Sequence, residues 1–441
     1  MTKPRFFEFP KSKFSKKERE LIAILCEVGE VIHKIWDKQY DSKAGRANFY
    51  PSGVSKKQIV EAAKKDKDIL APYTLVKKDK GKLVAVSYRD EYKKEIDQIC
   101  VLLDKAADVA DSRGMRKFFL QTRKAFDKGD FNTALRVYLG NIDLQFDILV
   151  GPTETYNDKL FGKKKAFEYI LSVYNPEESK YVEQMERVMQ NISILKPKRS
   201  VAEKIDAKKV RVRVDDAIMY AGPNASLHPS STNLPNEPEM VAKYGTKISV
   251  YRNAMHDKFE KKIKPHVSRF VDIGLTDSEL EEGYFRLIML HEITEGVVKF
   301  SDMQKRLEQY FDAVREFNAF ILGVKSASYH VLQGLIDTKQ YHSILFGLML
   351  YGIDVGARYQ NDSSLIEYAR GFSVLLSFAL ERGSIEIVDK KIKVDPVMLS
   401  SDIDVMSSVM LQLSEEGSVS DAETLFNEYA DFSVFEKLEK V

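Results

Sequence analysis

The sequence predicts an α+β protein that is mainly helical. Most of its apolar residues recur at spacings of three and four, as on one face of a helix. Strict alternation of apolar and polar residues, which is typical of half-exposed strands, is confined to short segments such as 210–214. A chain of 441 residues without internal repeats is long enough for two or three lobes. We therefore expect helices to form most of the core and strands to be few.

Capping boxes mark two of the expected helix starts. Ser15 and Glu18 precede a helix over residues 21–40, and Thr276 and Glu279 precede the apolar run 284–290. The other segments with helical periodicity are residues 51–66, 92–111, 116–126, 131–139, 163–173, 181–194, 254–272, 304–333, 341–357, 365–382, 396–417 and 420–428.

The expected strands and loops lie between these helices. The strands are residues 83–87, 146–150, 210–214, 247–251 and a strand-like stretch within 385–394. The basic segment 77–82 is expected to be a solvated turn, with a binding patch as the alternative. Residues 221–238 are expected to form a long irregular loop, because they contain five proline or glycine residues. Long loops of this kind are usually functional or disordered.

The composition excludes several classes of protein. Lysine and arginine number 68 against 66 acidic residues, so the net charge of +2 gives no reason to expect nucleic-acid or membrane binding. No stretch approaches 18 consecutive apolar residues, so no membrane span is expected. The basic N-terminal residues lack an apolar core and do not resemble a secretory signal. Two cysteines are too few for a disulfide framework, which favours a reducing, cytoplasmic location. The oligomeric state is not indicated.

The segment His291-Glu292-Ile293-Thr294-Glu295 differs by one residue from the helical zinc signature His-Glu-x-x-His. His291 and Glu295 are four residues apart, so on a helix they point the same way, as two ligands of one metal do. Glu292 has the position of the general base in such sites. The alternative is a partly exposed helix on which Glu295 pairs with Lys299.

A third metal ligand is expected from another buried helix, and Glu316 is the candidate. Its helical neighbours are small or apolar, so a carboxylate at this position needs a partner. The alternative is an ion pair with Arg286 or with another basic residue.

Two further segments carry polar side chains at positions where sites commonly form. Glu154 and Tyr156 follow an expected strand, and Asn233 and Asn236 lie in the long loop. The alternatives are an ordinary connection between elements for the first pair and turn formation for the two asparagines.

Taken together, these segments resemble the dipeptidyl peptidase III family of zinc metallopeptidases, in its shorter, microbial type. The resemblance covers about residues 92–429. The segments that carry it are residues 151–158 with 161–162, then 166–168, 220–222, 233–236 and 290–292. Their order and approximate spacing agree with the family pattern.

The resemblance implies a fold of two lobes around a wide cleft. Residues 1–14 are then a mobile basic arm. The implied lobes are a β-containing one of about residues 15–172, 214–252 and 396–441, and a helical, metal-binding one of about residues 173–213 and 253–395.

The resemblance also implies a role for each site residue. His291 and Glu316 would bind zinc, Glu292 would act as general base, and Tyr156 would stabilise the oxygen of the tetrahedral intermediate. Carboxylate and amide oxygens suit an ammonium group. The residues placed at the amino end of an oligopeptide substrate are Glu154, Asn233, Asn236 and Glu168.

The chain departs from the family pattern at four places. Glu295 stands where the shorter members carry histidine, and Arg315 and Phe320 replace two acids around Glu316. A later substrate-binding histidine is also missing, since its position falls near Tyr368 or Asn361. Zinc held by His291, Glu295 and Glu316 is expected, with manganese or iron as alternatives, because oxygen-rich sites tolerate these ions.

Three functions follow as hypotheses. If the metal is bound, the protein removes dipeptides from the free N-terminus of oligopeptides. The alternative is a pseudopeptidase without metal, which binds peptides or a protein partner through the retained ammonium-binding residues. A metal hydrolase with another substrate is the third.

Overall fold

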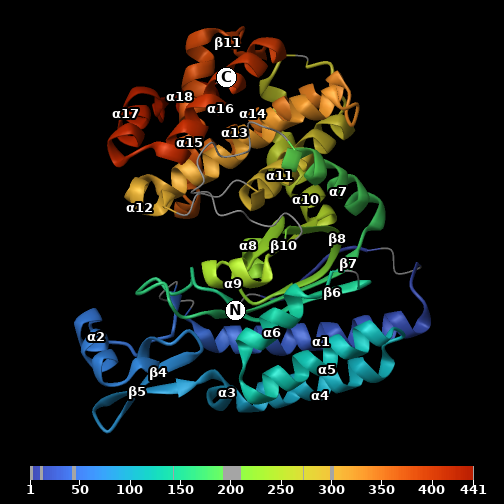
Figure 1. The fold of residues 1–441 in the computed structure, drawn as a ribbon, viewed down its shortest axis with the longest axis vertical. Coiled ribbons are helices and arrows are strands. Elements are labelled where there is room, and N and C mark those ends of the chain that lie inside the picture. The colour runs from blue at the N-terminus through green and yellow to red at the C-terminus, as the bar shows by residue number, and fades with distance from the viewer. Residues whose placement is uncertain are drawn as a thin grey trace. The chain divides into compact units, whose positions relative to one another are not determined.

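The computed structural model describes residues 3–9, 13–41, 46–142, 144–191, 210–271, 273–297 and 302–440. The chain divides into two compact units, each assembled from two stretches of sequence. Unit 1 comprises residues 1–175 and 213–247, and unit 2 comprises residues 176–212 and 248–441. Helices form most of the ordered structure (Figure 1), so the predicted α+β class with mainly helical content is confirmed.

Unit 1 contains most of a six-stranded sheet. The strands follow one another across it in the order β6-β7-β8-β10-β9, and β1 pairs with β8. The bounds are β1 (Arg5–Phe6), β6 (Phe146–Glu154), β7 (Ala166–Tyr174), β8 (Val210–Ala221), β9 (Ser231–Leu234) and β10 (Thr246–Tyr251). Two antiparallel pairs lie outside this sheet: β2 (Tyr40–Asp41) with β3 (Arg46–Ala47), and β4 (Thr74–Asp79) with β5 (Lys82–Ser87).

Helix α1 packs directly on this sheet, and α4 and α5 follow behind it (Figure 1). The approach is close, because a Cβ atom on Gly29 would lie 2.8 Å from the ring of Tyr169 on β7. The Tyr169 hydroxyl donates a hydrogen bond to the carbonyl of Leu25 at 2.7 Å. The helices of unit 1 are α1 (Lys16–Gln39), α2 (Lys56–Lys65), α3 (Tyr88–Glu91), α4 (Lys93–Val109), α5 (Arg113–Lys128), α6 (Phe131–Leu139), α8 (Asn224–Leu227) and α9 (Pro238–Tyr244), with a 3-10 turn at Lys67–Leu70.

Unit 2 is a bundle of helices with one hairpin. Its α-helices are α7 (Pro176–Asn191), α10 (Arg252–Lys258), α11 (Asp277–Val297), α12 (Met303–Leu307), α13 (Phe311–Leu332), α14 (Thr338–Arg358), α15 (Ile366–Arg382), α16 (Pro396–Glu416), α17 (Val419–Tyr429) and α18 (Ser433–Glu439). Shorter turns occupy Phe259–Ile263, Lys264–Arg269, Glu308–Tyr310 and Ser363–Leu365. The hairpin consists of β11 (Ile385–Val388) and β12 (Lys391–Val394). Among the described residues, no helix combines the length and the apolar character that a membrane crossing requires.

Helix α11 is central to unit 2 because glycines let two other helices approach it closely. A Cβ atom on Gly283 would lie 2.2 Å from the carbonyl oxygen of Ser343 on α14. On the opposing helix α13, a Cβ atom on Gly323 would lie 3.0 Å from the backbone of Leu290. These contacts fix the part of α11 that carries His291.

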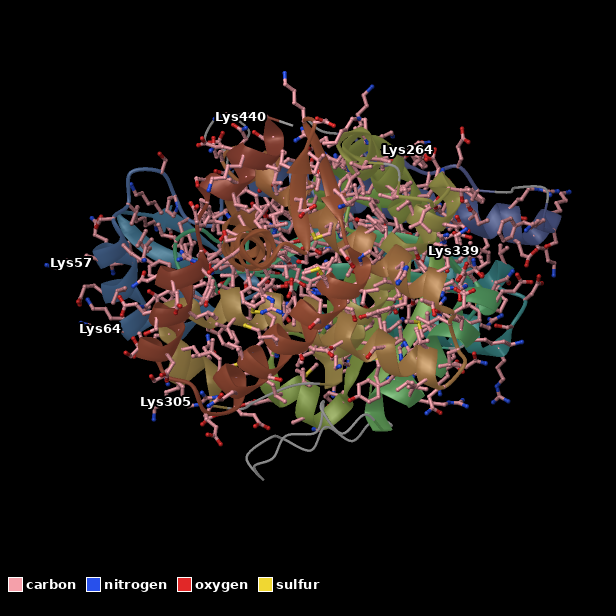
Figure 2. All side chains as sticks on the ribbon, turned by 90° about the horizontal axis from the view of Figure 1, so that it is seen from above. Lys57, Lys64, Lys264, Lys305, Lys339 and Lys440 are labelled. Carbon is pink, nitrogen blue, oxygen red and sulfur yellow. The ribbon has the colours of Figure 1, made fainter. Side chains whose placement is uncertain are left out.

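The start of α11 is held by its own cap and by two lysines. The backbone amide of Glu279 donates to the Thr276 hydroxyl at 3.3 Å, and Thr276 donates in return to the Glu279 carboxylate at 2.9 Å, so the predicted capping box is present. Lys339 lies 2.7 Å from Glu279, and Lys264 lies 3.0 Å from Asp277. Both lysines are labelled in Figure 2 and are partly exposed, so these pairs contribute little beyond the cap itself.

One predicted helix is wrong. Residues 163–173 were expected to be helical, but Ala166–Tyr174 form strand β7 between β6 and β8. Both faces of this strand are buried, as Phe167, Glu168 and Tyr169 show. A continuous run of buried residues has no alternation, so its periodicity does not distinguish a strand from a helix.

Three other segments differ from their expected structure or placement. Part of the N-terminal arm is ordered: Phe7 packs on the ring of Tyr220 with centroids 4.7 Å apart, next to the pairing of β1 with β8. Residues 396–441 group with unit 2 and not with the β-containing lobe, because α16 packs on α13. The expected irregular loop of residues 221–238 contains α8 and β9.

Candidate functional site

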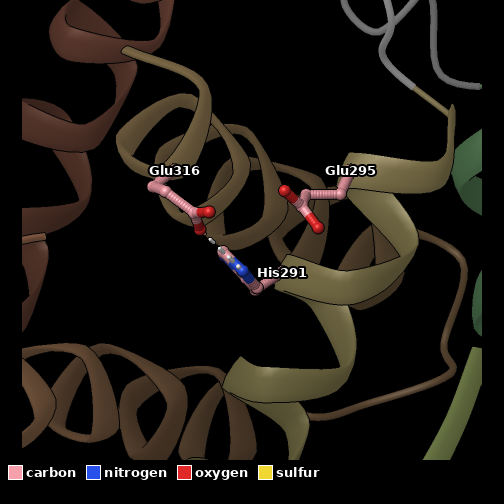
Figure 3. A group of neighbouring side chains, drawn as sticks. All are labelled: His291, Glu295 and Glu316. Atoms are coloured by element: carbon pink, nitrogen blue, oxygen red, sulfur yellow. Dashed lines mark ion pairs between the residues drawn. The ribbon is translucent and has the colours of Figure 1, made fainter. Parts of the chain in front are cut away.

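Three side chains of unit 2 converge between α11 and α13. His291 and Glu295 lie one turn apart on α11, and Glu316 faces them from α13 (Figure 3). The Nε2 atom of His291 lies 3.5 Å from Oε2 of Glu316. One ligand atom from each residue lies within 4.8 Å of those from the other two. The structure therefore brings together the three residues that the sequence proposed as ligands.

The donor atoms of the cluster suit a divalent metal in chemistry, and one pair of them also suits it in spacing. Zinc bonds to nitrogen and oxygen measure about 2.0–2.2 Å, so two ligands of one tetrahedral ion lie roughly 3.3 Å apart. The separation between His291 and Glu316 is close to that value. Oε2 of Glu316 is also buried and accepts no hydrogen bond from any described residue, a state that a bound cation would relieve. One imidazole and two carboxylates suit zinc and also tolerate manganese or iron.

Burial controls the protonation of these groups. It lowers the pKa of His291, whereas the charges of Glu292 and Glu295 act in the opposite direction. Burial raises the pKa of Glu316, and the neighbouring Glu295 carboxylate adds to that effect. Two buried carboxylates so close together resist simultaneous ionisation unless a positive charge compensates them.

Arg315 supplies such a charge from the protein itself. Its guanidinium forms a salt bridge with Glu295, and its Nη2 atom donates to Oε1 of Glu316 at 2.5 Å. The alternative partner of Glu316, Arg286, donates instead to Glu282 at 2.9 Å. Lys299, the alternative partner of Glu295, lies outside the described residues.

Glu292, the expected general base, is half-buried on α11. It interacts electrostatically with Lys258 on α10 and with Tyr351 on α14. The Lys258 ammonium lies 5.8 Å from the centre of the Tyr351 ring. Burial, above all, lowers the pKa of Lys258 to about 8. Nothing in the sequence around Lys258 signals that it lies near this site.

Two of the positions that depart from the family pattern, Phe320 on α13 and Tyr368 on α15, carry aromatic rings. The ring of Phe320 lies 4.1 Å from that of His291, measured between centroids. Burial raises the pKa of Glu316, and the hydroxyl of Tyr368 acts in the opposite direction. Aromatic side chains therefore occupy two positions beside the candidate metal ligands where an acid and a histidine were expected.

Four other predicted residues form a second cluster, which belongs to unit 1. Glu154 ends β6 next to a bulge, and the side-chain amide of Asn236 donates to its Oε2 atom at 2.5 Å. Glu168 lies on β7, and the Tyr156 hydroxyl donates to its Oε1 atom at 3.2 Å. Asn233 lies on β9, and among the hydrogen bonds of the described residues it does not reach Glu154.

Glu168 is the most enclosed member of this cluster, with 2% of its surface exposed. Besides Tyr156, it accepts hydrogen bonds from the Thr153 hydroxyl at 3.1 Å and from the Asn224 amide at 3.3 Å. Neither Thr153 nor Asn224 was predicted as a site residue. Thr153 could have been identified from the sequence, because it adjoins the predicted site residue Glu154. Asn224 lies in the segment expected to be irregular, where no pattern pointed to it.

The second cluster contains two carboxyl groups, of which Glu168 is buried and Glu154 is partly exposed, whereas Tyr156 is exposed. Burial raises the pKa of Glu154, and Lys165 and Asn236 partly offset this effect. Burial and the charge of Glu154 raise the pKa of Glu168. Burial and these two carboxylates also raise the pKa of Tyr156, so its hydroxyl stays protonated and able to donate. Such a group of acceptors is suited to an ammonium ion.

Comparison with known proteins identifies the family of the chain. The model of peptidase family M49 matches residues 41–311, which is more than half of the chain. Nudix hydrolase 3 of Arabidopsis thaliana is 23% identical over 380 residues, which cover 81% of this chain and 48% of that protein. The chain thus spans about half the length of this curated relative.

Two solved structures share the fold. Dipeptidyl peptidase III from Caldithrix abyssi superposes with a TM-score of 0.86 at 19% identity, covering 99% of this chain and 95% of that chain. Dipeptidyl-peptidase III from Corallococcus sp. strain EGB gives a TM-score of 0.77 at 18% identity, covering 99% and 92%. At this level of identity the likeness shows the fold, and the family match identifies the chain. The chain therefore belongs to peptidase family M49, the dipeptidyl peptidase III family that the sequence motifs predicted.

Proposed function

We propose that the protein is a metal-dependent peptidase that removes dipeptides from the free N-terminus of oligopeptides. The observation that carries this proposal is the cluster of His291, Glu295 and Glu316, whose ligand atoms lie within 4.8 Å of one another. Zinc is the proposed ion, with manganese or iron as alternatives. A cytoplasmic location is part of the proposal, because two cysteines are too few for a disulfide framework.

Each predicted residue has a role in this proposal. A bound metal would supply a Lewis acid that polarises the scissile carbonyl and makes water more acidic. Glu292 accepts the proton of the attacking water and passes it to the leaving amine. The protonated Tyr156 hydroxyl donates to the oxygen on which negative charge develops.

The substrate's amino end is assigned to the cluster in unit 1. Glu154 supplies a half-buried carboxylate, and the side-chain oxygens of Asn233 and Asn236 supply further acceptors for the –NH3+ group. Glu168 adds negative charge behind Tyr156. Recognition of the ammonium group would not depend on the residues that follow, so we expect a broad range of oligopeptides as substrates.

The test of this proposal combines metal analysis with dipeptide release. Purified protein is incubated with zinc, manganese or iron, freed of excess ion and assayed with a dipeptidyl fluorogenic substrate. We expect about one bound ion per chain, and activity that Glu292→Gln abolishes. Glu423→Gln on α17, where the side chain is exposed, is the matched control and is expected to leave activity unchanged. A protein that retains no ion and releases no dipeptide would overturn the proposal.

A second function, peptide binding without cleavage, is favoured by one observation. The guanidinium of Arg315 already pairs with Glu295 and Glu316, so part of the negative charge of the cluster is neutralised by the protein without a metal. In that case the function of the protein rests on the second cluster, in unit 1, which binds the amino end of a peptide without cleaving it. We then expect metal-free protein to bind a tripeptide with a free N-terminus but not its N-acetyl form. Glu154→Gln is expected to abolish this binding, because it removes the carboxylate that pairs with the ammonium group.

A further inference from the structure

The guanidinium of Arg315 contacts both carboxylates of the candidate metal centre. It forms a salt bridge with Oε1 of Glu295 on α11, and its Nη2 atom donates to Oε1 of Glu316 at 2.5 Å. Hydrogen bonds between ions are about twice as strong as those between neutral groups. One side chain therefore bridges the two acids that a divalent ion would use as ligands.

We propose that Arg315 is a counter-cation built into the metal centre, and that a divalent ion binds by displacing its guanidinium from Glu295 and Glu316. This inference rests on the proposed metal centre and concerns how that centre is loaded. Binding of the ion breaks two charge-assisted hydrogen bonds and brings a positive charge toward a guanidinium. The ion is therefore held more weakly, and exchanges more readily, than the same three ligands would allow without Arg315.

The structure also provides a place for the displaced guanidinium. Nη2 of Arg315 lies 3.7 Å from Oδ1 of Asp312, three residues earlier on α13. The Asp312 side chain is 65% exposed and that of Arg315 is 40% exposed, so the guanidinium can turn outward without crossing the core. Asp312 is then the partner of Arg315 in the metal-loaded protein.

These two residues should change metal affinity in opposite directions. Arg315→Gln removes the competing cation and is expected to lower the Kd for Zn2+ by on the order of tenfold to a hundredfold, the equivalent of one or two charge-assisted hydrogen bonds. Asp312→Asn removes the outward partner and is expected to raise the Kd by about twofold to fivefold, since an exposed pair is weak. In an Arg315→Gln background, Asp312→Asn should have no effect, because its partner is gone.

The experiment measures Zn2+ affinity on the full chain by competition with a chromophoric chelator, starting from metal-free protein. Lys325→Gln is the matched control: it removes one positive charge from the same helix, where Lys325 pairs with Asp404 at 2.6 Å, and should leave the Kd unchanged. Arg315→Lys keeps the charge and should stay within about tenfold of the wild type. Thermal melts followed by circular dichroism verify that each variant is folded.

The outcomes separate this inference from the proposed function. Tighter binding in Arg315→Gln than in the wild type and in Lys325→Gln supports the inference, whether or not the wild-type protein is active. An active, metal-bound wild type whose Kd is unchanged or raised by Arg315→Gln overturns the inference and leaves the proposed function standing. If neither the wild type nor Arg315→Gln binds an ion, both are overturned.

Discussion

The hydroxyl of Tyr156 donates a hydrogen bond to the Glu168 carboxylate over 3.2 Å, which ties the turn after β6 to β7. In the proposed mechanism the same hydroxyl stabilises the developing oxyanion. Tyr156→Phe is therefore expected to lower kcat for dipeptide release by about a hundredfold, with a much smaller change in KM. Steady-state kinetics on a dipeptidyl fluorogenic substrate measure both quantities.

Thr153→Val is the control for this prediction. It removes another donor to Glu168, the Thr153 hydroxyl at 3.1 Å, and leaves Tyr156 in place. Equal losses of kcat in the two variants would mean that Tyr156 acts through Glu168 and does not stabilise the oxyanion.

The buried ion pair between Lys247 and Asp147 should matter for the stability of unit 1. The two groups lie 2.7 Å apart, and Lys247 also donates to the backbone carbonyl of Asn141 at 2.6 Å. Lys247→Met leaves the Asp147 carboxylate buried without its cation, which we expect to cost about 3–5 kcal/mol in the free energy of unfolding. Urea unfolding followed by the fluorescence of Trp36 reports on this unit, because Trp36 is the chain's single tryptophan.

The double variant Lys247→Met/Asp147→Leu tests the cause of that loss. With both charges removed, most of the stability should return, because no unpaired charge remains buried. A double variant as unstable as Lys247→Met would assign the loss to packing around Lys247 instead.

The contact between α11 and α14 gives a prediction that links packing to the metal centre. Gly283→Ala places a Cβ atom where the carbonyl oxygen of Ser343 now lies 2.2 Å away, so the two helices must separate. Overpacking of this kind costs about 1–3 kcal/mol. Because α11 carries His291 and Glu295, affinity for Zn2+ should fall together with thermal stability. Gly140→Ala in unit 1, where the nearest atom would be 3.6 Å away, should change neither.

His330 should make unit 2 less stable in acid. It is fully buried on α13, and burial lowers its pKa to about 4, against an ordinary value of 6.5. Between pH 6.5 and pH 4 the unfolded chain binds a proton at this residue and the folded chain does not. The free energy of unfolding should therefore decrease as the pH falls through this window, by about 3–4 kcal/mol in total, and then level off below pH 4.

The measurement is urea unfolding followed by circular dichroism at several pH values. His330→Leu removes the titrating group, so the difference in stability between wild type and variant isolates its contribution. A difference that does not depend on pH between 4 and 6.5 would show that His330 titrates normally in the folded protein.

The sequence predicted the parts of the fold that rest on local interactions. The capping boxes of α1 and α11 are present as expected, because Ser15 and Thr276 act on residues only three positions away. Strand β7 was not recognised, because what makes Ala166–Tyr174 a strand is pairing with β6 on one side and with β8, which lies beyond α7 in the sequence, on the other. The turn expected within residues 77–82 is present at Lys80 and Gly81. Of the two strands on either side of this turn, β5 was predicted and β4 was not.

The same distinction applies to the site. Helical spacing sufficed to pair His291 with Glu295, and an acid among apolar neighbours sufficed to single out Glu316. The partners of these residues could not be inferred, since Arg315 reaches from α13 to a side chain on α11 and Tyr368 comes from α15. Contacts between side chains of different helices depend on how those helices cross, which no local pattern encodes.

The division of the chain into two units has a consequence for biosynthesis. Every residue of unit 1 lies before Ile248, whereas the last metal-ligand candidate, Glu316, comes 69 residues after Lys247. At about 5–20 residues per second, a ribosome needs roughly 3–14 seconds to cover that distance. The ammonium-binding cluster is therefore present in the nascent chain before the carboxylates of the metal centre have both been made. In the proposed mechanism, a nascent chain in that interval already has the residues assigned to the amino end of a peptide, but not yet all of the residues assigned to its cleavage.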